Sequence, residues 1–323
     1  KIVIKLAAAF EAVGIVLLLF AFVPQFGAEG VWVSVFTAIS AFCNAGFDLF
    51  GRFGAYSSLV PYVNNYYVQA VIMFMIMAGG LGFMVWVELA EYRKKRRLSL
   101  HAKVVLQFSV IFWVGGAVLL ALLEWSNPRT MGGLSVPGKI MAALFQSVST
   151  RTAGMNTIDL AACSPISKLL MSVLQFIGAA PGSTGGGVKV TTFAVLILTI
   201  RSVAQGRDDC VIGGHHIESK TVYRALTIIV IGAVAAFGSA VVVYYNTAET
   251  VSVIDCIFES CSAFGTVGLS VGVTGQLNTG AKLLYMACMF MGRVGPVSLA
   301  ISLTAKPDDN KRKVLPVGHI NVG

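Results

Sequence analysis

Long hydrophobic runs separated by short polar segments follow one another along this chain. Six runs hold about 20 residues or more, the length at which an α-helix crosses a hydrocarbon layer of about 30 Å. They cover residues 2–23, 68–89, 104–123, 169–200, 223–245 and 283–305. The pattern predicts an all-α integral membrane protein that crosses the bilayer several times.

Between the two runs of each successive pair lies a shorter amphipathic segment, followed by a stretch that contains glycine. The segments cover residues 33–42, 138–149 and 253–262, and the stretches read SAFCNAGF (40–47), STRTAGM (149–155) and SAFGTVGL (262–269). Run, half-length segment and run therefore follow in this order three times, with a period of roughly 110 residues. We interpret them as three copies of one membrane module.

Composition agrees with a membrane protein. Hydrophobic residues make up 56% of the chain and charged residues 12%, whereas charged residues are about 25% of an ordinary soluble domain. The six cysteines form no Cys-x-x-Cys pair, and most lie in hydrophobic stretches. We expect them to be small core residues rather than disulfides or metal ligands.

The net charge of +9 is concentrated in three segments, residues 93–103, 201–224 and 306–313. This placement follows the positive-inside rule and argues against a nucleic-acid partner. It predicts that the three segments, and with them the C-terminus, lie in the cytoplasm, and that the glycine stretches lie toward the outer side.

With that orientation the modules repeat in parallel. Parallel copies around an axis along the membrane normal build a central pore, whereas inverted copies favour an alternating-access carrier. The predicted units are residues 1–98, 99–206 and 207–305, with a cytoplasmic tail at 306–323. Because the chain begins inside a hydrophobic run, at Lys1, we expect a fourth unit to precede it.

The glycine stretches are candidates for a selectivity filter. A cation that leaves water needs replacement oxygens, and backbone carbonyls supply them without the trapping effect of a full charge. Glycine adopts the backbone angles that turn successive carbonyls toward one axis. The predicted K⁺ filter residues are Asn44, Ala45, Gly46, Thr152, Ala153, Gly154, Thr266, Val267 and Gly268. The alternative is that these glycines only allow tight turns or close helix packing.

Two charged residues lie beside the candidate filter. Each amphipathic segment suits a pore helix whose C-terminal dipole faces a cation. Glu259 lies near the end of the third segment, where we expect it to accept hydrogen bonds behind the filter; direct contact with the ion is the alternative. Arg151 would repel a cation in the path, so we expect it to support the filter from behind, paired with a pore-helix carboxylate.

The run at 169–200 is too long for one straight span, and Pro181 and four following glycines interrupt it. Irregular backbone at membrane depth is tolerated where it lines a cavity or is buried in protein. We expect a gating loop below the filter, formed by Gly182, Ser183, Thr184, Gly185, Gly186 and Gly187. Lys189 either adds a positive charge to this gate or extends to the cytoplasmic interface.

The same loop resembles a phosphate-binding P-loop only in part. Gly182-x-x-x-x-Gly187 has the spacing, but Val188 displaces Lys189 by one position and no strand precedes the loop. We therefore expect no nucleotide bound by this chain and no enzymatic activity.

Arg293 lies inside the last hydrophobic run, where an arginine is costly unless it is paired or hydrated. Gly292, Gly295 and Pro296 indicate a thinned, kinked helix that leaves room beside it. Arg293 is predicted either to act as an electrostatic gate residue or to form an ion pair with another span, for instance with Glu11 or Glu88.

Several ordered motifs carry a family resemblance. They are FxAxSAFxNAGF (36–47), RTAGxN (151–156), GSTxxGxKxTTF (182–193), ExxSAFGTVGL (259–269) and MFxGRxGP (289–296). With them the chain resembles the membrane subunits of Ktr-type potassium transporters, in the superfamily that also holds Trk and plant HKT proteins. That family has four units of span, pore segment and span, and the three units here resemble its second, third and fourth.

The resemblance implies a pore-forming subunit for K⁺ uptake in the bacterial plasma membrane, with Na⁺ as a candidate activator or coupling ion. It also implies a homodimer and a cytoplasmic regulatory ring with nucleotide-binding domains, and assigns gating to the loop and Arg293. The alternative function is a Na⁺- or H⁺-coupled secondary transporter that uses the broken helix as its substrate site.

Overall fold

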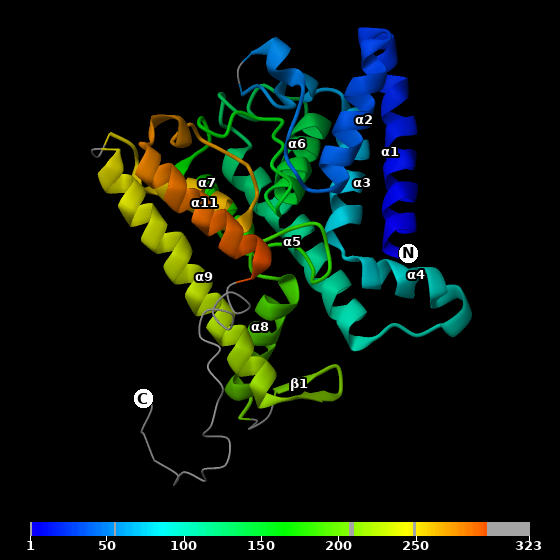
Figure 1. Cartoon of the computed structure of the whole chain (residues 1–323), viewed down its shortest axis with the longest axis vertical. Coiled ribbons are helices and arrows are strands. Elements are labelled where there is room, and N and C mark those ends of the chain that lie inside the picture. Colours follow the sequence, from blue (N-terminus) through cyan, green and yellow to red (C-terminus); the bar gives the residue numbers. More distant parts are fainter. Residues whose placement is uncertain (1, 55, 207–209, 248–249, 296–323) are drawn as a thin grey trace.

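The computed structural model describes residues 2–54, 56–206, 210–247 and 250–295, and it is built mainly from α-helices (Figure 1). Three groups of helices follow one another, and each group holds a long helix, a half-length helix and at least one further helix. The long helices are α1 (Ile2–Phe26), α5 (Leu100–Glu124) and α9 (Ser219–Asn246).

The long helices have the length and hydrophobicity that a membrane span requires. They hold 25, 25 and 28 residues, or about 37 Å and more at 1.5 Å per residue. Large apolar side chains such as Phe20, Leu122 and Val234 point outward from them, as expected for a surface that faces lipid. Figure 1 shows α1 and α9 on opposite flanks of the molecule.

A half-length helix packs against the long helix of its own group: α2 (Glu29–Phe42) on α1, α6 (Val136–Ser149) on α5, and α10 (Val253–Gly265) on α9. The hydroxyls of Ser135 and Ser252 cap the first turns of α6 and α10. The predicted segments 33–42, 138–149 and 253–262 are helical, and each helix ends within the first four residues of its glycine stretch.

The second helix of the first two groups is interrupted. The expectation of one continuous helix over 68–89 is wrong, because α3 (Tyr66–Gly80) and α4 (Phe83–Lys95) meet at an angle of 98°. Gly82, with φ of 88°, supplies the turn between them. The break predicted in the run 169–200 is confirmed, since α7 (Pro165–Phe176) and α8 (Val190–Ala204) flank an irregular loop.

The last helix, α11 (Thr279–Val294), ends at Gly295, which has φ of 96°. The remainder of the predicted run 283–305 and the predicted tail 306–323 lie outside the described residues. A short antiparallel hairpin of β1 (Cys210–Ile212) and β2 (His215–Ile217) connects α8 to α9.

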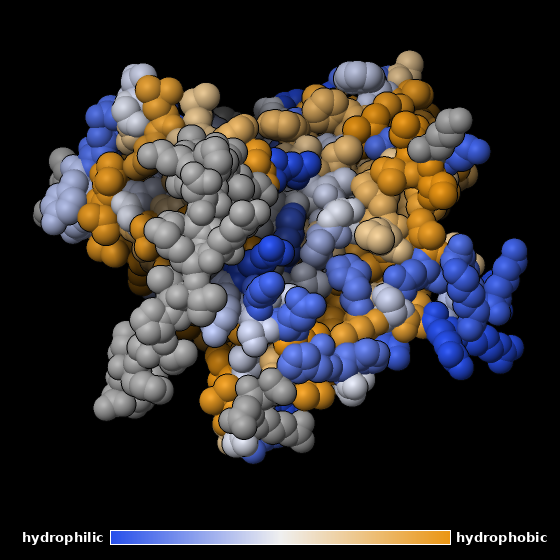
Figure 2. Space-filling view, turned by 60° about the horizontal axis from the view of Figure 1, so that its bottom comes forward, coloured by the Kyte–Doolittle hydropathy of each residue, from blue (hydrophilic) through white to orange (hydrophobic). Residues whose placement is uncertain are grey.

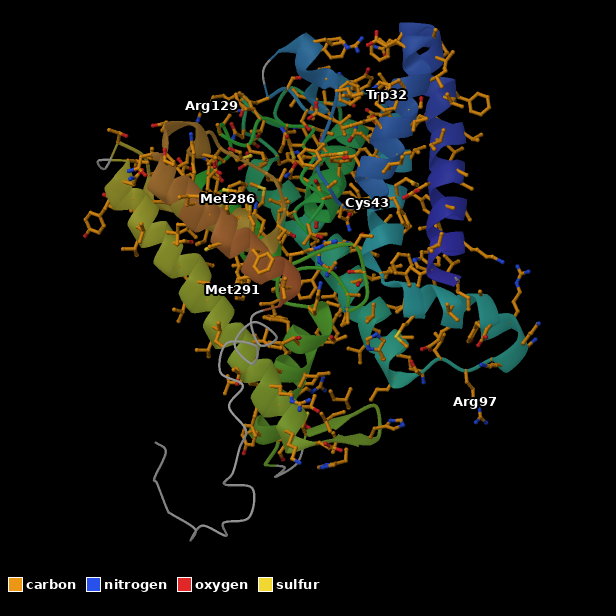
Figure 3. The ribbon with its side chains drawn as sticks, viewed as in Figure 1. Trp32, Cys43, Arg97, Arg129, Met286 and Met291 are labelled. Carbon is orange, nitrogen blue, oxygen red and sulfur yellow. The ribbon has the colours of Figure 1, made fainter. Side chains whose placement is uncertain are left out.

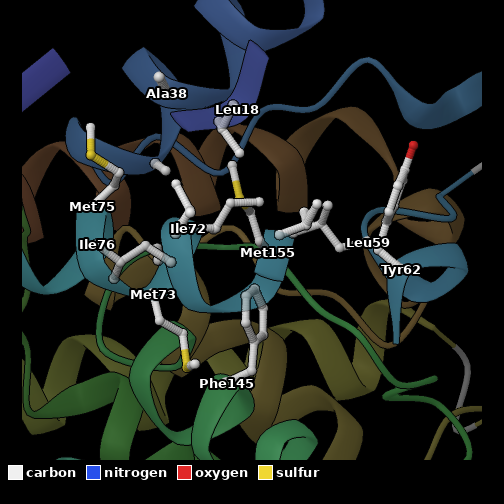
Figure 4. Close-up of a cluster of buried hydrophobic side chains, with 14 of the residues drawn as sticks. Leu18, Ala38, Leu59, Tyr62, Ile72, Met73, Met75, Ile76, Phe145 and Met155 are labelled. Atoms are coloured by element: carbon white, nitrogen blue, oxygen red, sulfur yellow. The ribbon is translucent and has the colours of Figure 1, made fainter. Parts of the chain in front are cut away.

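The largest hydrophobic cluster joins neighbouring groups rather than lying within one (Figure 4). Leu18 of α1 and Ile72 and Met75 of α3 are fully or almost fully buried, and Phe145 of α6 packs into the same cluster. Met155, which directly follows the second glycine stretch, also belongs to it. The core therefore packs the second glycine stretch against the helices of the preceding group.

Candidate ion-conducting site

The backbones of the three glycine stretches repeat one conformation. In each stretch, the first and third of three consecutive residues have positive φ, and the residue between them does not. The flanking pairs are Asn44 and Gly46, Thr152 and Gly154, and Thr266 and Gly268, with φ from 50° to 94°. Positive φ is uncommon for residues other than glycine, so its recurrence at Asn44, Thr152 and Thr266 marks a constrained backbone. Alternating handedness of this kind turns successive carbonyls toward the same side of a strand.

The three glycines of these stretches lie against one another. A Cβ atom at Gly46 would lie 2.8 Å from the Ala153 carbonyl oxygen, and one at Gly154 would lie 2.3 Å from the Val267 carbonyl oxygen. A Cβ at Gly268 would lie 3.6 Å from Gly154 Cα. The structure thus brings together all three stretches that the sequence singled out, although they come from separate modules.

A serine near the end of each half-length helix fixes the stretch that follows. The hydroxyl of Ser40 donates to the Phe47 carbonyl at 2.6 Å, and that of Ser262 donates to the Leu269 carbonyl at 2.7 Å. The hydroxyl of Ser149 donates to the Met155 carbonyl. In each case the acceptor directly follows the filter glycine. Sequence reasoning did not assign these serines a role, although Ser40, Ser149 and Ser262 begin the repeated stretches.

The loop between α7 and α8 reaches all three stretches from one side. The Thr184 hydroxyl accepts from the Asn44 side-chain amide at 3.0 Å. A Cβ at Gly185 would lie 2.2 Å from Thr152 Oγ1, and one at Gly186 would lie 2.1 Å from Thr266 Oγ1. Three consecutive loop residues therefore contact the first positive-φ residue of three different glycine stretches, and only glycine fits at two of them.

Two backbone carbonyls near the C-terminal ends of α3 and α11 accept hydrogen bonds from this loop. The Thr184 amide donates to the Gly79 carbonyl of α3, and the Gly187 amide donates to the Gly292 carbonyl of α11, both at 3.1 Å. The residue four positions after Gly292 is Pro296, which has no amide hydrogen to offer. Sequence reasoning missed this role of Gly79 and Gly292. The shared Gly-x-x-Gly spacing at 79–82 and 292–295 is the pattern that could have indicated it.

Two cations bond to carbonyls of the loop. Arg293 Nη1 donates to the Thr184 carbonyl, and Lys189 Nζ donates to the Gly185 carbonyl at 2.6 Å. Within the part of the chain that the structure describes, Arg293 forms no ion pair with Glu11 or Glu88. The Glu11 carboxylate lies 3.8 Å from the Cys43 sulfur instead, at the end of α2 (Figure 3). Arg293 thus contacts the loop, and its role as an electrostatic gate residue stays a prediction.

Arg151 is buried and bonds to the base of the same loop. Its Nη2 donates to the Gly178 carbonyl at 2.7 Å, and its guanidinium lies 5.2 Å from the centre of the Phe112 ring. No carboxylate among the described residues lies within 4.0 Å of it, so the expected pairing with a pore-helix carboxylate is wrong. The loop carbonyl and the aromatic ring supply its electrostatic compensation.

Glu259 lies almost fully buried behind the third stretch, where it accepts four hydrogen bonds. Its donors are the hydroxyls of Ser270 (2.5 Å) and Thr274 (2.6 Å) and the amides of Val271 (3.0 Å) and Val273 (3.1 Å). These donors occupy the carboxylate, so its geometry fits support of the outer loop. Within the described residues no group of three or more His, Cys, Asp or Glu side chains could hold a metal ion.

The two faces of the molecule differ in character. Figure 3 shows Trp32 near one end and Arg97 at the other. Tryptophan is enriched at both membrane interfaces, so Trp32 gives no direction across the membrane, and the orientation expected from the charge distribution stays a prediction.

Relatives of the chain are transport proteins. It is 33% identical over 324 residues to the Ktr system potassium uptake protein B of Bacillus subtilis, which covers 100% of this chain and 71% of that protein. It is 37% identical to the protein of that name from Vibrio alginolyticus, and 36% identical to the potassium/sodium uptake protein NtpJ of Enterococcus hirae. These two matches cover 95% and 94% of this chain, and 67% of each relative.

The fold has a solved counterpart. The crystal structure of the potassium transporter TrkH from Vibrio parahaemolyticus matches with a TM-score of 0.69 at 20% identity, over 89% of this chain and 62% of that one. The family described as TrkH, cation transport protein, matches residues 1–313. Taken with the converging glycine stretches, these matches show that the chain belongs to the TrkH family of cation transport proteins, which includes the Ktr proteins.

Proposed function

We propose that this chain forms the K⁺-translocating pore of a potassium uptake system. One observation carries the proposal: the three glycine stretches converge at Gly46, Gly154 and Gly268, and the loop residues Gly185 and Gly186 lie directly against them. Carbonyls of the residues predicted for the filter, Asn44 to Gly46, Thr152 to Gly154 and Thr266 to Gly268, replace the water around the ion.

The choice of K⁺ rests on the relatives, whose names describe potassium uptake or, for NtpJ, potassium and sodium uptake. Na⁺ enters this proposal as a candidate activator or coupling ion. The neutral carbonyls of the site suit a monovalent cation, since they supply partial charge to an ion that must also leave.

The loop Gly182 to Gly187 is proposed to gate this pore. Glycine-rich backbone is easily rearranged, and the bonds that hold the loop are few and mostly neutral. Lys189 and Arg293 bond to loop carbonyls, so their charges lie near the path while the loop is in place. Movement of the loop would break both of these bonds.

The remaining parts of the proposal concern assembly. We place the protein in a bacterial plasma membrane with a cytoplasmic C-terminus, and divide it into units 1–98, 99–206 and 207–305 with a tail at 306–323. The word "system" in the relatives' names supports a further component. We propose a homodimer of this subunit bound to a cytoplasmic nucleotide-binding ring, with no nucleotide on this chain itself.

K⁺ uptake by a potassium-starved host tests the pore. The full-length protein should restore uptake, and Gly268→Ser should abolish both uptake and the preference for K⁺ over Na⁺, because φ of 94° strains any side chain there. Gly133→Ser, at an exposed glycine with open space around it, is the matched control. Unchanged uptake and preference in Gly268→Ser would overturn the filter. Deletion of residues 180–186 should raise K⁺ flux, and unchanged flux would overturn the gate.

A further inference from the structure

A cavity of about 440 Å³ lies at the end of the molecule that carries the basic loops, away from the filter. One wall is the first turns of α5, the opposite wall is the last turns of α8, and the β1–β2 hairpin closes the third side. Its volume falls in the range of about 300–1,000 Å³ that is typical of small-molecule sites. None of the residues discussed for the pore lines it.

The cavity is lined by both cationic and apolar side chains, which come from both helices. Lys103 of α5 and Arg201 of α8 are the charged side chains among its described lining residues. Neither has a carboxylate within 4.0 Å in the described part of the chain. Val104, Phe108 and Leu198 form the apolar wall. Arg207, Asp208 and Asp209, which follow α8 in the sequence, all lie outside the described residues.

This arrangement fits an anionic amphiphile better than a free anion. Two cations on facing helices suit a phosphate group, and an adjoining apolar wall at the end of a membrane span suits the first carbons of an acyl chain. Basic pockets between spans on the cytoplasmic side are where anionic headgroups bind. Figure 2 shows hydrophilic side chains gathered on the face turned toward the viewer, with hydrophobic surface on the flanks beside it.

We propose that this cavity binds the headgroup of an anionic phospholipid, with its phosphate between Lys103 and Arg201. The phosphate removes the repulsion between the two cations and bridges α5 to α8. The hairpin is attached to α8 by two hydrogen bonds and moves with it. The Thr199 hydroxyl donates to Cys210 Sγ at 3.2 Å, and the Val211 amide donates to Ser202 Oγ at 3.5 Å. A bound lipid therefore fixes the position of α8 and the hairpin together.

The position of α8 matters because α8 begins where the loop ends. Lys189 precedes its first residue, and the Val190 amide donates to the Ala179 carbonyl inside the loop region at 3.1 Å. A lipid that holds α8 against α5 therefore favours the loop position seen in the structure. This second step rests on the proposed gating function, whereas the binding site itself does not.

Lipid binding is measured on the purified full-length protein in detergent, by native mass spectrometry and by thermal shift. Phosphatidylglycerol should bind and raise the melting temperature, and phosphatidylcholine should not. The double variant Lys103→Gln and Arg201→Gln should bind phosphatidylglycerol roughly 10- to 30-fold more weakly. The control, Lys94→Gln and Arg97→Gln, removes the same charge from exposed positions outside the cavity and should bind like the wild type.

Inorganic phosphate and glycerol phosphate separate a lipid from a soluble ligand. Neither should reproduce the thermal shift of phosphatidylglycerol. Equal stabilisation by inorganic phosphate would overturn the lipid assignment. Equal loss of binding in the control variant would show a nonspecific surface effect and overturn the site, as would unchanged binding in the Lys103 and Arg201 variant.

K⁺ flux in vesicles tests the coupling to the loop. Phosphatidylcholine vesicles that contain phosphatidylglycerol should give lower flux than vesicles without it, and the variant without residues 180–186 should give equal flux in both. An equal lipid response in the deletion variant would overturn the coupling through α8. Lipid binding without K⁺ flux in any preparation would overturn the proposed pore and still support the lipid site.

Discussion

The side-chain amide of Asn44 donates to the hydroxyl of Thr184 at 3.0 Å, which joins the first filter stretch to the loop of the next module. The same hydroxyl donates to the Phe42 carbonyl at 2.9 Å, at the end of α2. One threonine side chain thus bridges the end of a half-length helix and the residue that opens its filter stretch. The position of the loop and the geometry of the filter are linked at this point.

Replacement of Thr184 by valine should loosen the loop, because valine keeps the shape of threonine and removes both hydrogen bonds. At about 1 kcal/mol for each bond, the closed state loses about 1–2 kcal/mol, or roughly 5- to 30-fold in the ratio of open to closed loops. The measurement is resting K⁺ flux in vesicles, which should rise. Thr184→Ser keeps the hydroxyl and should stay near the wild type; a rise of the same size in both variants would contradict this explanation.

Gly154→Ala should abolish K⁺ uptake. Its Cβ would lie 2.3 Å from the Val267 carbonyl oxygen, closer than any unstrained contact, and φ at this position is 81°. The two adjacent glycine stretches must then separate. This displaces the carbonyl oxygens that are proposed to replace the water around the ion. Uptake in a potassium-starved host measures the effect. Gly133→Ala introduces the same methyl group into open space and should leave uptake unchanged; wild-type uptake by Gly154→Ala would count against the convergence of the strands.

Local sequence features predicted the parts of the fold that depend on local properties. The hydrophobic runs predicted α1, α5 and α9, and Pro181 with its glycines predicted the break between α7 and α8. The bend at Gly82 was missed, since glycine is common in membrane helices and residues 68–89 read as one continuous run. Whether a glycine allows a turn of the backbone or close packing of two helices depends on the residues that face it in the folded protein.

The partners of the loop could not be predicted for the same reason. Arg151 bonds to the Gly178 carbonyl rather than to a carboxylate because the broken helix leaves that carbonyl without its helical donor. The carbonyls of Gly79 and Gly292 are free for an equivalent reason. Apart from the Gly-x-x-Gly spacing at 79–82 and 292–295, the residue types do not show which backbone carbonyls are available, and the three-dimensional arrangement is needed to find their partners.

Glu259→Gln should destabilise the outer part of the third module. The carboxylate accepts four hydrogen bonds, and the amide that replaces it is neutral and offers a single acceptor oxygen. We expect a loss of about 2 kcal/mol, seen as a lower melting temperature of the purified protein. Glu91→Gln, which breaks only the exposed pair with Lys95, should change stability by less than about 1 kcal/mol. Equal effects of the two variants would show that the buried cluster adds no stability.

Lys168 and Asp255 form an ion pair of 2.7 Å between α7 and α10, largely shielded from solvent. A double-mutant cycle with Lys168→Met and Asp255→Asn should give a coupling free energy of about 1–2 kcal/mol, since each single variant leaves the other group without its partner. Thermal or denaturant unfolding of the purified protein measures it. Additive effects of the two substitutions would mean that the pair contributes nothing to the contact between the modules.

The loop is tethered by amides to Gly79 in one module and Gly292 in another. Displacement of either helix alone therefore breaks one tether and leaves the second in place. Complete release of these two tethers therefore requires changes at both α3 and α11. Under the proposed gating function, a rearrangement that reaches both modules would free the loop more fully than one confined to a single flank of the protein.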